Sequence, residues 1–511
     1  LRVAHRIRCG SADADHTVVC TFTRKAAAEL RDRLAAYGVP VSTTGPGRVP
    51  TPGVRVGTLH QLARNLIRRH CVDTGRTVPI VVDQRAVMLR QLTDGPGAAA
   101  ALAVEIGWAK ARGLSPDSYE QAVAECHRHA PLPADEVAHG FRAYQAALDR
   151  RGGLDLDDLL VRSAELLATD VSFAERMRWR YRHLAVDEFQ DVNPAQFRLL
   201  TSLLGQSRDL CVVGDPHQAI YGWNGADPTL LARISDLIGP LATLELTENH
   251  RSTPQIVATA EAVLGEDRAY RARSVAADGP VPRVTAYDDE WAEADGVADV
   301  LLSHHDAGVP WSEQAVLART NDQLSVIARV LGRWGIPHRV HAVPGDGADP
   351  PRPDGEAEVN AVTDHGSGPT TEAVELTTFH RAKGAEWTSV CVTGIEDGLV
   401  PVVHAVDDAA RSEEQRLLYV ALTRPARFLA CSWARRRTTA GGRVVERQPS
   451  PWLPGVGAGT SPTPRDRSEP SGSGPSESEP SRPVATEPGP TERERAADRI
   501  AELRGALHGE R

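Results

Sequence analysis

The chain has 511 residues with a net charge of −10, 41% hydrophobic and 25% charged residues, an ordinary composition for a globular protein of two or three domains. Its seven cysteines form no CxxC pair and no apolar run approaches the roughly 20 residues of a membrane helix, which argues against a disulfide framework, a zinc site and a membrane span. These features predict a cytoplasmic protein, and a negative total charge does not exclude a locally basic groove for nucleic acid.

The first half of the chain alternates short apolar strands with amphipathic helices. Strands are predicted at 16–21, 54–57, 183–186 and 210–213, and helices at 1–7, 26–34, 59–69, 154–168, 194–204 and 228–238. Thr23 is a predicted N-cap of the helix at 26–34. Between them, residues 82–149 have a helical pattern interrupted by Gly and Pro, which predicts an all-α insertion. The alternation predicts a parallel sheet with helices on both faces.

A second α/β unit is predicted further along the chain. Its strands are expected at 284–286, 315–318, 336–340, 374–378 and 390–393, and its helices at 291–304, 323–334 and 413–424. The segment at 341–369 is rich in Gly, Pro and Asp and is predicted to be a loop. Residues 448–491 consist mainly of Ser, Pro, Gly and Glu and are predicted to be disordered, whereas 492–507 can form one amphipathic helix.

Adjacent carboxylates follow one strand of the first unit, and a glutamine follows the next. Asp187 and Glu188 stand in the sequence VDEFQD, and Gln218 stands in GDPHQAIYGW. Mg²⁺ prefers hard oxygen ligands, so Asp187 can hold this ion through water while Glu188 orients or deprotonates an attacking water. An isolated Asp-Glu pair at a strand end is common by chance, and Gln218 alone would be a polar turn residue. Three further motifs make chance unlikely: NHRS at 249–252, HRAKGAEW at 380–387 and EEQRLLYVALTR at 413–424.

The five motifs in this order resemble the superfamily 1 DNA helicases of the UvrD/Rep/PcrA type over about residues 1–435. The resemblance implies an α/β fold with two RecA-like parallel-sheet motor domains. The first implied motor domain, at 1–250, is incomplete at its N-terminus and carries a helical insertion at about 75–165. The second, at 251–447, has a loop at 341–369 in place of the usual helical subdomain. A disordered linker at 448–491 and a short helix at 492–511 follow.

The same resemblance implies a site for ATP and Mg²⁺. Asp187 would be the metal ligand, Glu188 the catalytic carboxylate and Gln218 the sensor of the terminal phosphate. Arg251 and Arg424 would be arginine fingers, although a surface salt bridge is the commoner role of a single Arg. The remaining implied ATP-binding residues are His250, in place of an adenine-stacking tyrosine, Glu386 near the ribose, and Gly384. Pro425 replaces an alanine of the family and is expected to end the preceding helix at Arg424.

A single-stranded DNA track is implied by a second group of residues. Proteins bind single strands by stacking bases on aromatic rings while basic and hydroxyl groups follow the backbone. Core packing is the alternative role for each ring, and Asn224 departs from the family by replacing an arginine. The residues that match family DNA contacts are Phe22, His60, Tyr221, Trp223, Asn224 and His380.

A phosphate-binding GxxxxGK[ST] loop does not occur in the printed sequence. Two hypotheses therefore stand. In the first, the chain is a fragment of an ATP-dependent 3′–5′ single-stranded DNA translocase or helicase of DNA repair or replication restart, with duplex junctions and repair proteins as further partners. In the second, it is an ATPase-inactive DNA-binding or scaffold relative with the same fold. Residues 1–511 alone are expected to show little or no ATPase, and the oligomeric state is left open.

Overall fold

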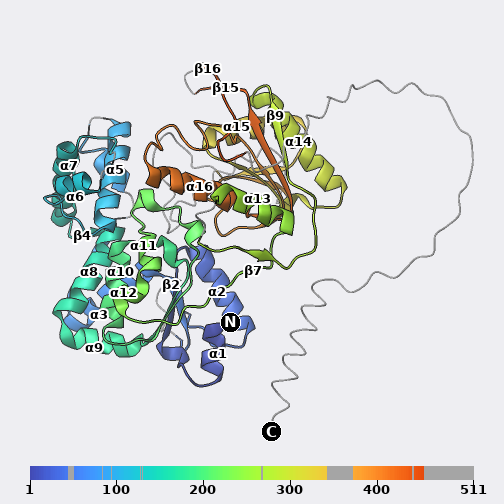
Figure 1. The fold of residues 1–511 in the computed structure, drawn as a ribbon. Helices are drawn as coiled ribbons and strands as arrows, with labels where there is room; N and C mark the ends of the chain where they lie inside the picture. The colour runs from blue at the N-terminus through green and yellow to red at the C-terminus, as the bar shows by residue number, and fades with distance from the viewer. Residues whose placement is uncertain are drawn as a thin grey trace, which may run out of the picture. The chain divides into compact units, whose positions relative to one another are not determined.

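The computed structural model describes residues 1–43, 51–82, 85–93, 95–126, 128, 130–265, 269–341, 372–439 and 442–453 (Figure 1). The loop predicted at 341–369 lies outside these residues after His341, as do 454–491 of the predicted linker and the whole predicted helix at 492–511. Within the described ranges, no helix has the length and apolar character needed to cross a bilayer.

The first lobe is built on a four-stranded, all-parallel sheet with the strand order β2-β1-β5-β6. Its strands are β1 (Thr17–Thr21), β2 (Arg55–Thr58), β5 (His183–Val186) and β6 (Leu210–Val212). Its helices are α1 (Arg2–Arg8), α2 (Arg24–Ala36), α3 (Leu59–Thr74), α8 (Leu156–Thr169), α9 (Val171–Arg180), α10 (Pro194–Leu204), α11 (Thr229–Ala232) and α12 (Ile234–Ile238). Thr23 caps α2 as predicted, accepting a hydrogen bond from Ala26 N at 3.1 Å.

Successive side chains of a strand point to opposite faces, and both faces of this sheet are covered. Val18 and Cys20 of β1 pack in one core with α3, α8 and α10, whereas Val19 between them packs in the other with α1 and α2. The apolar strands that the sequence predicted are therefore buried on both sides. Helices on both faces leave the edge formed by the carboxyl ends of the strands as the place where polar loops meet.

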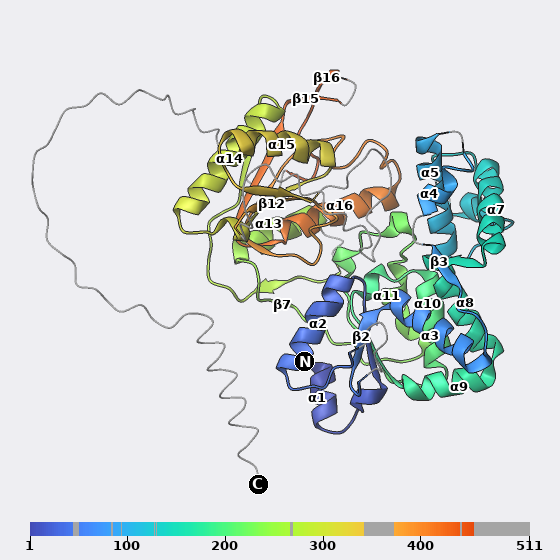
Figure 2. The same ribbon diagram turned by 180° about the vertical axis from the view of Figure 1, so that it is seen from behind.

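The predicted insertion is a separate small bundle with its own core. Its helices are α4 (Arg85–Leu89), α5 (Pro96–Ala111), α6 (Tyr119–Glu125) and α7 (Ala134–Arg150). Helices α5 and α6 both pack against α7, as Figure 1 shows, and Figure 2 shows α4, α5 and α7 together from behind. The all-α prediction missed a short parallel pair at the base of the bundle, β3 (Ile80–Val82) with β4 (Gly153–Asp155). Because the two strands run parallel, the chain enters and leaves the insertion in the same direction.

The second lobe is built on a six-stranded, all-parallel sheet with the order β11-β12-β10-β13-β14-β9. Its strands are β9 (Arg283–Tyr287), β10 (Gln314–Ala318), β11 (His338–Val340), β12 (Val374–Thr378), β13 (Trp387–Val392) and β14 (Pro425–Ala434). Helices α14 (Glu290–Asp306) and α15 (Asn321–Arg333) cover one face, and α13 (Pro254–Leu264) and α16 (Asp408–Leu422) cover the other. Two short pairs complete the lobe: β7 (Glu248–Asn249) with β8 (Arg273–Ser274), and β15 (Arg436–Thr438) with β16 (Val444–Glu446).

Four local predictions were wrong. The single helix predicted at 228–238 is broken at Arg233 into α11 and α12. Helix α16 ends at Leu422 rather than at Arg424, and Pro425 opens strand β14, a first-residue position at which proline removes no needed ladder bond. The helix predicted from Leu154 begins at Leu156, because Asp155 is its N-cap and accepts from Asp158 N at 2.9 Å. The disorder predicted from residue 448 begins too early, since Leu453 is buried in the core of the second lobe.

A cluster of buried charges fixes the insertion to the first lobe. The Asp155 carboxylate is 2% exposed and accepts hydrogen bonds from Lys110 at 2.9 Å and from Arg85 and Tyr144. Lys110 also donates to Asp158 at 2.8 Å. The two cations hold the pKa of the Asp155 carboxyl far below its usual range, against the effect of burial. Removing one member would leave buried charge only partly compensated.

We predict that Lys110→Met lowers the free energy of unfolding of the insertion by about 3 kcal/mol. This loss is near the lower end for a broken buried ion pair, because Arg85 still contacts Asp155. Hydrogen–deuterium exchange should show faster exchange in α5 and α7. Arg142→Met is the matched control, because its ion pair with Asp117 is exposed and worth about 0–1 kcal/mol. Equal exchange in both variants would contradict the anchoring role.

Candidate nucleotide and nucleic-acid site

Asp187 and Glu188 lie where β5 ends, at the carboxyl edge of the first sheet. Asp187 N donates to Cys20 O at 2.8 Å, which continues the pairing with β1. Glu188 has φ 56° and is the only non-glycine residue with positive φ in the described part of the chain. Such a backbone is strained for a residue with a side chain and is often found at functional sites. Gln190 Nε2 holds the Glu188 carboxylate at 2.6 Å.

The acidic pair has the donor chemistry of a magnesium site. Burial, and then the neighbouring Glu188, raises the pKa of the Asp187 carboxyl. A cation bound there would relieve this accumulation of negative charge. No cluster of three or more potential metal-ligating side chains occurs among the described residues. Mg²⁺ commonly takes only one or two carboxylates and completes its shell with water and substrate phosphate, so the residues present fit this ion.

Gln218 connects this acidic edge to the second lobe. It ends the short helix η3 (Pro216–Gln218), which follows β6, the neighbour of β5. Gln218 Nε2 donates to Asp215 Oδ2 at 2.7 Å, and Gln218 Oε1 accepts from Arg424 Nη2 at 3.5 Å. Gln190 Oε1 in turn accepts from Asp215 N at 2.9 Å. A polar path therefore runs from Glu188 through Gln190, Asp215 and Gln218 to Arg424.

Arg424 is a buried cation without a carboxylate in contact among the described residues. It is 1% exposed, and its guanidinium donates to Val420 O at 2.8 Å and Ala385 O at 3.3 Å. Burial, followed by the positive charge of Arg251, lowers the pKa of Arg424 to about 10, while Glu188 acts in the opposite direction. An unpaired buried charge is unfavourable, so this position favours an anionic ligand.

Arg251 and Glu386 meet on the second lobe. Arg251 Nε donates to Glu386 Oε2 at 2.7 Å and Nη1 to Thr423 O at 3.4 Å, so it lies beside the residue that precedes Arg424. His250 points elsewhere: its side chain is 74% exposed and pairs with Glu248 at 3.6 Å. Gly384 has φ +81°, a left-handed conformation that suits glycine in the turn between Lys383 and Glu386.

Lys383, which was not among the predicted site residues, joins the two lobes. Its ammonium donates to Asp191 of the VDEFQD motif and to Gln218 O at 2.6 Å, and lies 3.7 Å from Glu188. Burial raises the pKa of the Asp191 carboxyl to about 7 despite the opposing effect of Lys383. A signal was present in the sequence, because this chain has only three lysines and Lys383 stands inside a motif.

The predicted aromatic residues form one cluster that draws on both lobes. Phe22 and Tyr221 are stacked with ring centroids 5.0 Å apart, and Trp223 meets His380 of the second lobe edge-on at 6.2 Å. Tyr221 also lies under the Lys383 ammonium at 5.2 Å from its ring centroid. Trp223 is half-buried, and its indole Nε1 has no hydrogen-bond partner in the described structure. The aromatic rings that now contact one another could instead stack on the bases of a bound single strand.

His60 and Asn224 lie at the margins of this cluster. His60 is buried in the first turn of α3 and lines, with Phe22, Asp187 and Glu188, a cavity of about 10 Å³, close to the minimum for one water. Asn224 is half-buried and its backbone N donates to Tyr221 O at 3.0 Å. Phe22 and His60, which are predicted DNA contacts, therefore lie around the same cavity as the predicted catalytic carboxylates.

Glu413 was also missed by sequence reasoning. It accepts from Trp223 N at 3.4 Å, and Gly222 leaves room for its carboxylate, which a Cβ at that position would strike. Burial raises the pKa of Glu413 to about 6. Its neighbour Arg416 donates to Ala219 O at 2.8 Å. Helix α16 therefore contacts the segment that leads from Gln218 to Trp223 along much of its length.

These features define a two-lobed RecA-like α/β protein whose facing edges enclose carboxylates, a glutamine and two arginines. Comparison with protein families gives the particular group. Residues 1–238 match the UvrD/REP helicase N-terminal domain, and residues 244–343 and 358–436 match the UvrD-like helicase C-terminal domain. The chain belongs to the UvrD-like family of superfamily 1 helicases.

Individual relatives agree with this assignment. The chain is 32% identical to the ATP-dependent DNA helicase UvrD2 of Mycobacterium tuberculosis H37Rv over 556 aligned positions, which cover 92% of this chain and 78% of the relative. It is 30% identical to DNA helicase II and 28% identical to the ATP-dependent DNA helicase Rep, both of Escherichia coli K12. Those two alignments cover 63% and 66% of this chain but only 44% and 50% of the relatives.

We predict that Trp223→Ala weakens single-stranded DNA binding by about 1–3 kcal/mol, the contribution of one stacked base. Fluorescence anisotropy with a labelled oligonucleotide measures this directly. Trp179→Ala is the matched control, because that ring is 62% exposed in the same lobe and contacts His16 and Arg182, away from the aromatic cluster. An unchanged affinity for Trp223→Ala would assign that ring to packing alone.

Proposed function

We propose that this chain is an ATP-dependent 3′–5′ translocase on single-stranded DNA that opens duplex junctions during DNA repair or replication restart. The observation that carries the proposal is Arg424, a buried and permanently charged group joined through Gln218 to the Asp187–Glu188 edge. A triphosphate bound between these groups would offset the charge of Arg424 and place its terminal phosphate beside the carboxylates.

Each residue of the site has a distinct task in this proposal. Asp187 would hold Mg²⁺ through water, and the ion would supply positive charge that offsets the negative charge of the triphosphate. Glu188 accepts a proton from the attacking water or orients it, and Gln190 keeps its carboxylate in place. Arg251 and Arg424 stabilise negative charge that develops on the phosphate oxygens during transfer. Little covalent chemistry is asked of the protein, which agrees with a site made of positioned charges.

Coupling to DNA follows from the contacts between the lobes. The segment from Gln218 to Trp223 holds the phosphate sensor at one end and base-stacking rings at the other. Lys383 and Arg416 bind its backbone carbonyls from the second lobe, at Gln218 and Ala219. Any change in lobe separation on nucleotide binding would therefore move Tyr221 and Trp223 relative to His380, and the grip on bases would change with it.

Glu188→Gln should bind ATP but stop its turnover, because the amide keeps the shape of the carboxylate and cannot accept the proton. Single-strand-stimulated phosphate release and ATP binding are measured on the polypeptide as its gene encodes it, including any residues upstream of Leu1. Glu175→Gln, at an exposed position on α9, is the matched control. Unaltered turnover in Glu188→Gln would reject Glu188 as the catalytic carboxylate.

The polarity of movement is tested separately. A 3′–5′ translocase should displace streptavidin from a biotin at the 5′ end of a single strand and leave it on a 3′ biotin. Displacement should require ATP and Mg²⁺ and should be lost in Glu188→Gln. Displacement from the 3′ end only would overturn the proposed direction while leaving the ATP-driven motor in place.

The second candidate function is an ATPase-inactive DNA-binding or scaffold protein. The observation that favours it is His250, which stands in place of an adenine-stacking tyrosine of the family but has a side chain that is 74% exposed and pairs with Glu248. The two functions separate in one assay on the encoded polypeptide. Tight binding of single-stranded DNA with no stimulated hydrolysis supports the inactive protein, and stimulated hydrolysis supports the motor.

A further inference from the structure

The turn that carries Trp223 is closed by its own main chain. Trp223 lies in the short helix η4 (Gly222–Asn224), and Gly225, the C-cap of this helix, has φ +89°. Gly225 N donates to Gly222 O at 3.0 Å. A positive φ suits glycine, and the bond across the turn ties the position of Trp223 to that of Gly225. A displacement of Gly225 would therefore move the Trp223 ring.

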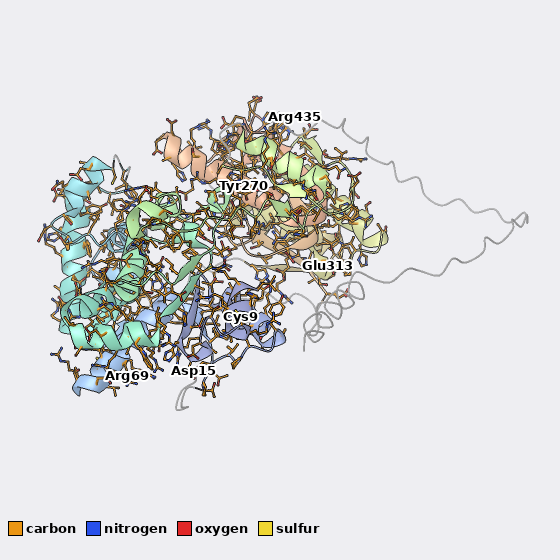
Figure 3. All side chains as sticks on the ribbon, turned by 60° about the horizontal axis from the view of Figure 1, so that its bottom comes forward. Cys9, Asp15, Arg69, Tyr270, Glu313 and Arg435 are labelled. Atoms are coloured by element: carbon orange, nitrogen blue, oxygen red, sulfur yellow. The ribbon has the colours of Figure 1, made fainter. Side chains whose placement is uncertain are left out.

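The segment before this turn is held by the second lobe. The ring of His217 is stacked on Tyr270, which Figure 3 labels, with the ring centroids 4.4 Å apart. Ile220 is buried in the core of the second lobe, and Glu413 of α16 accepts from Trp223 N at 3.4 Å. The start of the turn is therefore attached to the second lobe.

The end of the turn lies against the insertion, because α5 packs on η4. A Cβ atom added to Gly225 would lie 2.6 Å from the Cβ atom of Ala111, the last residue of α5, and 3.5 Å from Trp108 O. Two carbon atoms in favourable contact lie about 3.5–4.0 Å apart, so a side chain at residue 225 would collide with Ala111. Glycine lets the turn lie directly on the helix.

Helix α5 is a firm support for the turn. Trp108 is buried in the core of the insertion, and Ala111 is buried as well. Lys110, between them, donates to Asp155 at 2.9 Å and to Asp158 at 2.8 Å, which fixes this end of α5 to the first lobe. Moving the support would break buried ion pairs, which is costly.

We propose that Ala111 is a positioning residue for the base-stacking ring: α5 sets where the Trp223 turn lies, so the grip on a single strand depends on the docking of the insertion. This inference rests on the proposed function, because it takes Trp223 as a DNA contact. It goes beyond that function by giving the insertion a part in single-strand binding that requires no contact of Ala111 with the strand.

The first test exchanges the sizes of the two residues in contact, on the polypeptide as its gene encodes it. Gly225→Ala should weaken binding of a labelled single-stranded oligonucleotide, measured by fluorescence anisotropy without nucleotide, about tenfold, the order of one lost stacked base. Adding Ala111→Gly removes the methyl group that the new side chain meets. We expect it to restore affinity to within about threefold of the unmodified protein, because the strain of alanine at positive φ remains.

Ala124→Gly is the matched control for the second substitution, because Ala124 is exposed on α6 of the same bundle. It should restore no affinity to Gly225→Ala. An unchanged affinity in Gly225→Ala, no recovery with Ala111→Gly, or equal recovery with both glycine substitutions would overturn the inference.

A second test asks whether the loss is transmitted through the Trp223 ring. In a chain that carries Trp223→Ala, adding Gly225→Ala should weaken single-strand binding by less than about twofold, because residues that act as a unit are non-additive. Losses that multiply in the double variant would show that Gly225→Ala disturbs binding by another route, and the inference would be wrong.

A third test weakens the support itself. Lys110 is buried and cannot reach a strand, yet Lys110→Met should weaken single-strand binding about threefold, less than the loss of one whole stacked base. Arg142→Met removes the same charge from an exposed position in the same bundle and should bind like the unmodified protein. Faster hydrogen–deuterium exchange in α5 of Lys110→Met with unchanged affinity would contradict the role of α5.

The outcomes also separate this inference from the proposed function. An unchanged affinity in Trp223→Ala removes the ring from the DNA track and overturns the inference, whereas the ATP-driven motor is judged by hydrolysis and displacement. Weaker binding in Trp223→Ala with unchanged binding in Gly225→Ala overturns only the positioning role of Ala111. The expected pattern of affinities supports that role even if stimulated hydrolysis is absent and the proposed motor fails.

Discussion

The buried charge of Arg424 is the constraint around which the site is arranged. A guanidinium keeps its charge at any physiological pH, and removing it from water is costly unless something compensates. The chain provides carbonyl oxygens and the Gln218 amide in its immediate surroundings, and places the carboxylates of Glu188 and Asp215 further away. The positive charge of Arg424 is thereby solvated by polar groups but not neutralised by a carboxylate in contact with it. A polyanionic ligand that binds beside it would supply the missing negative charge.

Parallel sheet topology explains why such distant residues meet. Asp187 and Gln218 follow neighbouring strands of the first sheet, and Lys383 follows β12 of the second, so each lobe presents its loops at one edge. The lobes are joined by bonds from Lys383 and Arg416 to one segment of the first lobe, and Ile220 of that segment is buried in the core of the second lobe. The directional bonds can be exchanged for others when a ligand arrives, whereas the burial of Ile220 keeps the segment attached to the second lobe.

Local sequence signals predicted the fold and most residues of the candidate site. They failed for contacts between residues that are far apart in the sequence. The carboxylates after β5 and the Gln218 turn were predictable, because strand ends and motif spacing are local properties. Strand β14 was missed because its opening Pro425 was interpreted only as a helix stop. Tyr270 could not be predicted, since its contact with His217 joins residues 53 positions apart in sequence through a fold that no short pattern encodes. Lys383 was the intermediate case, visible as a rare residue but without a partner until Asp191 was brought beside it.

Gly222 has a consequence for how the lobes can approach each other. Because the residue has no side chain, the Glu413 carboxylate rests almost against the main chain of the first lobe. The distance between helix α16 and the first lobe at that point is set by the main chain of Gly222, with no side chain in between. An added methyl group at this position would meet the Glu413 carboxylate, which would have to turn away and give up its hydrogen bond to Trp223 N. The absence of a side chain at residue 222 therefore lets helix α16 hold the main chain of the segment that carries Tyr221 and Trp223.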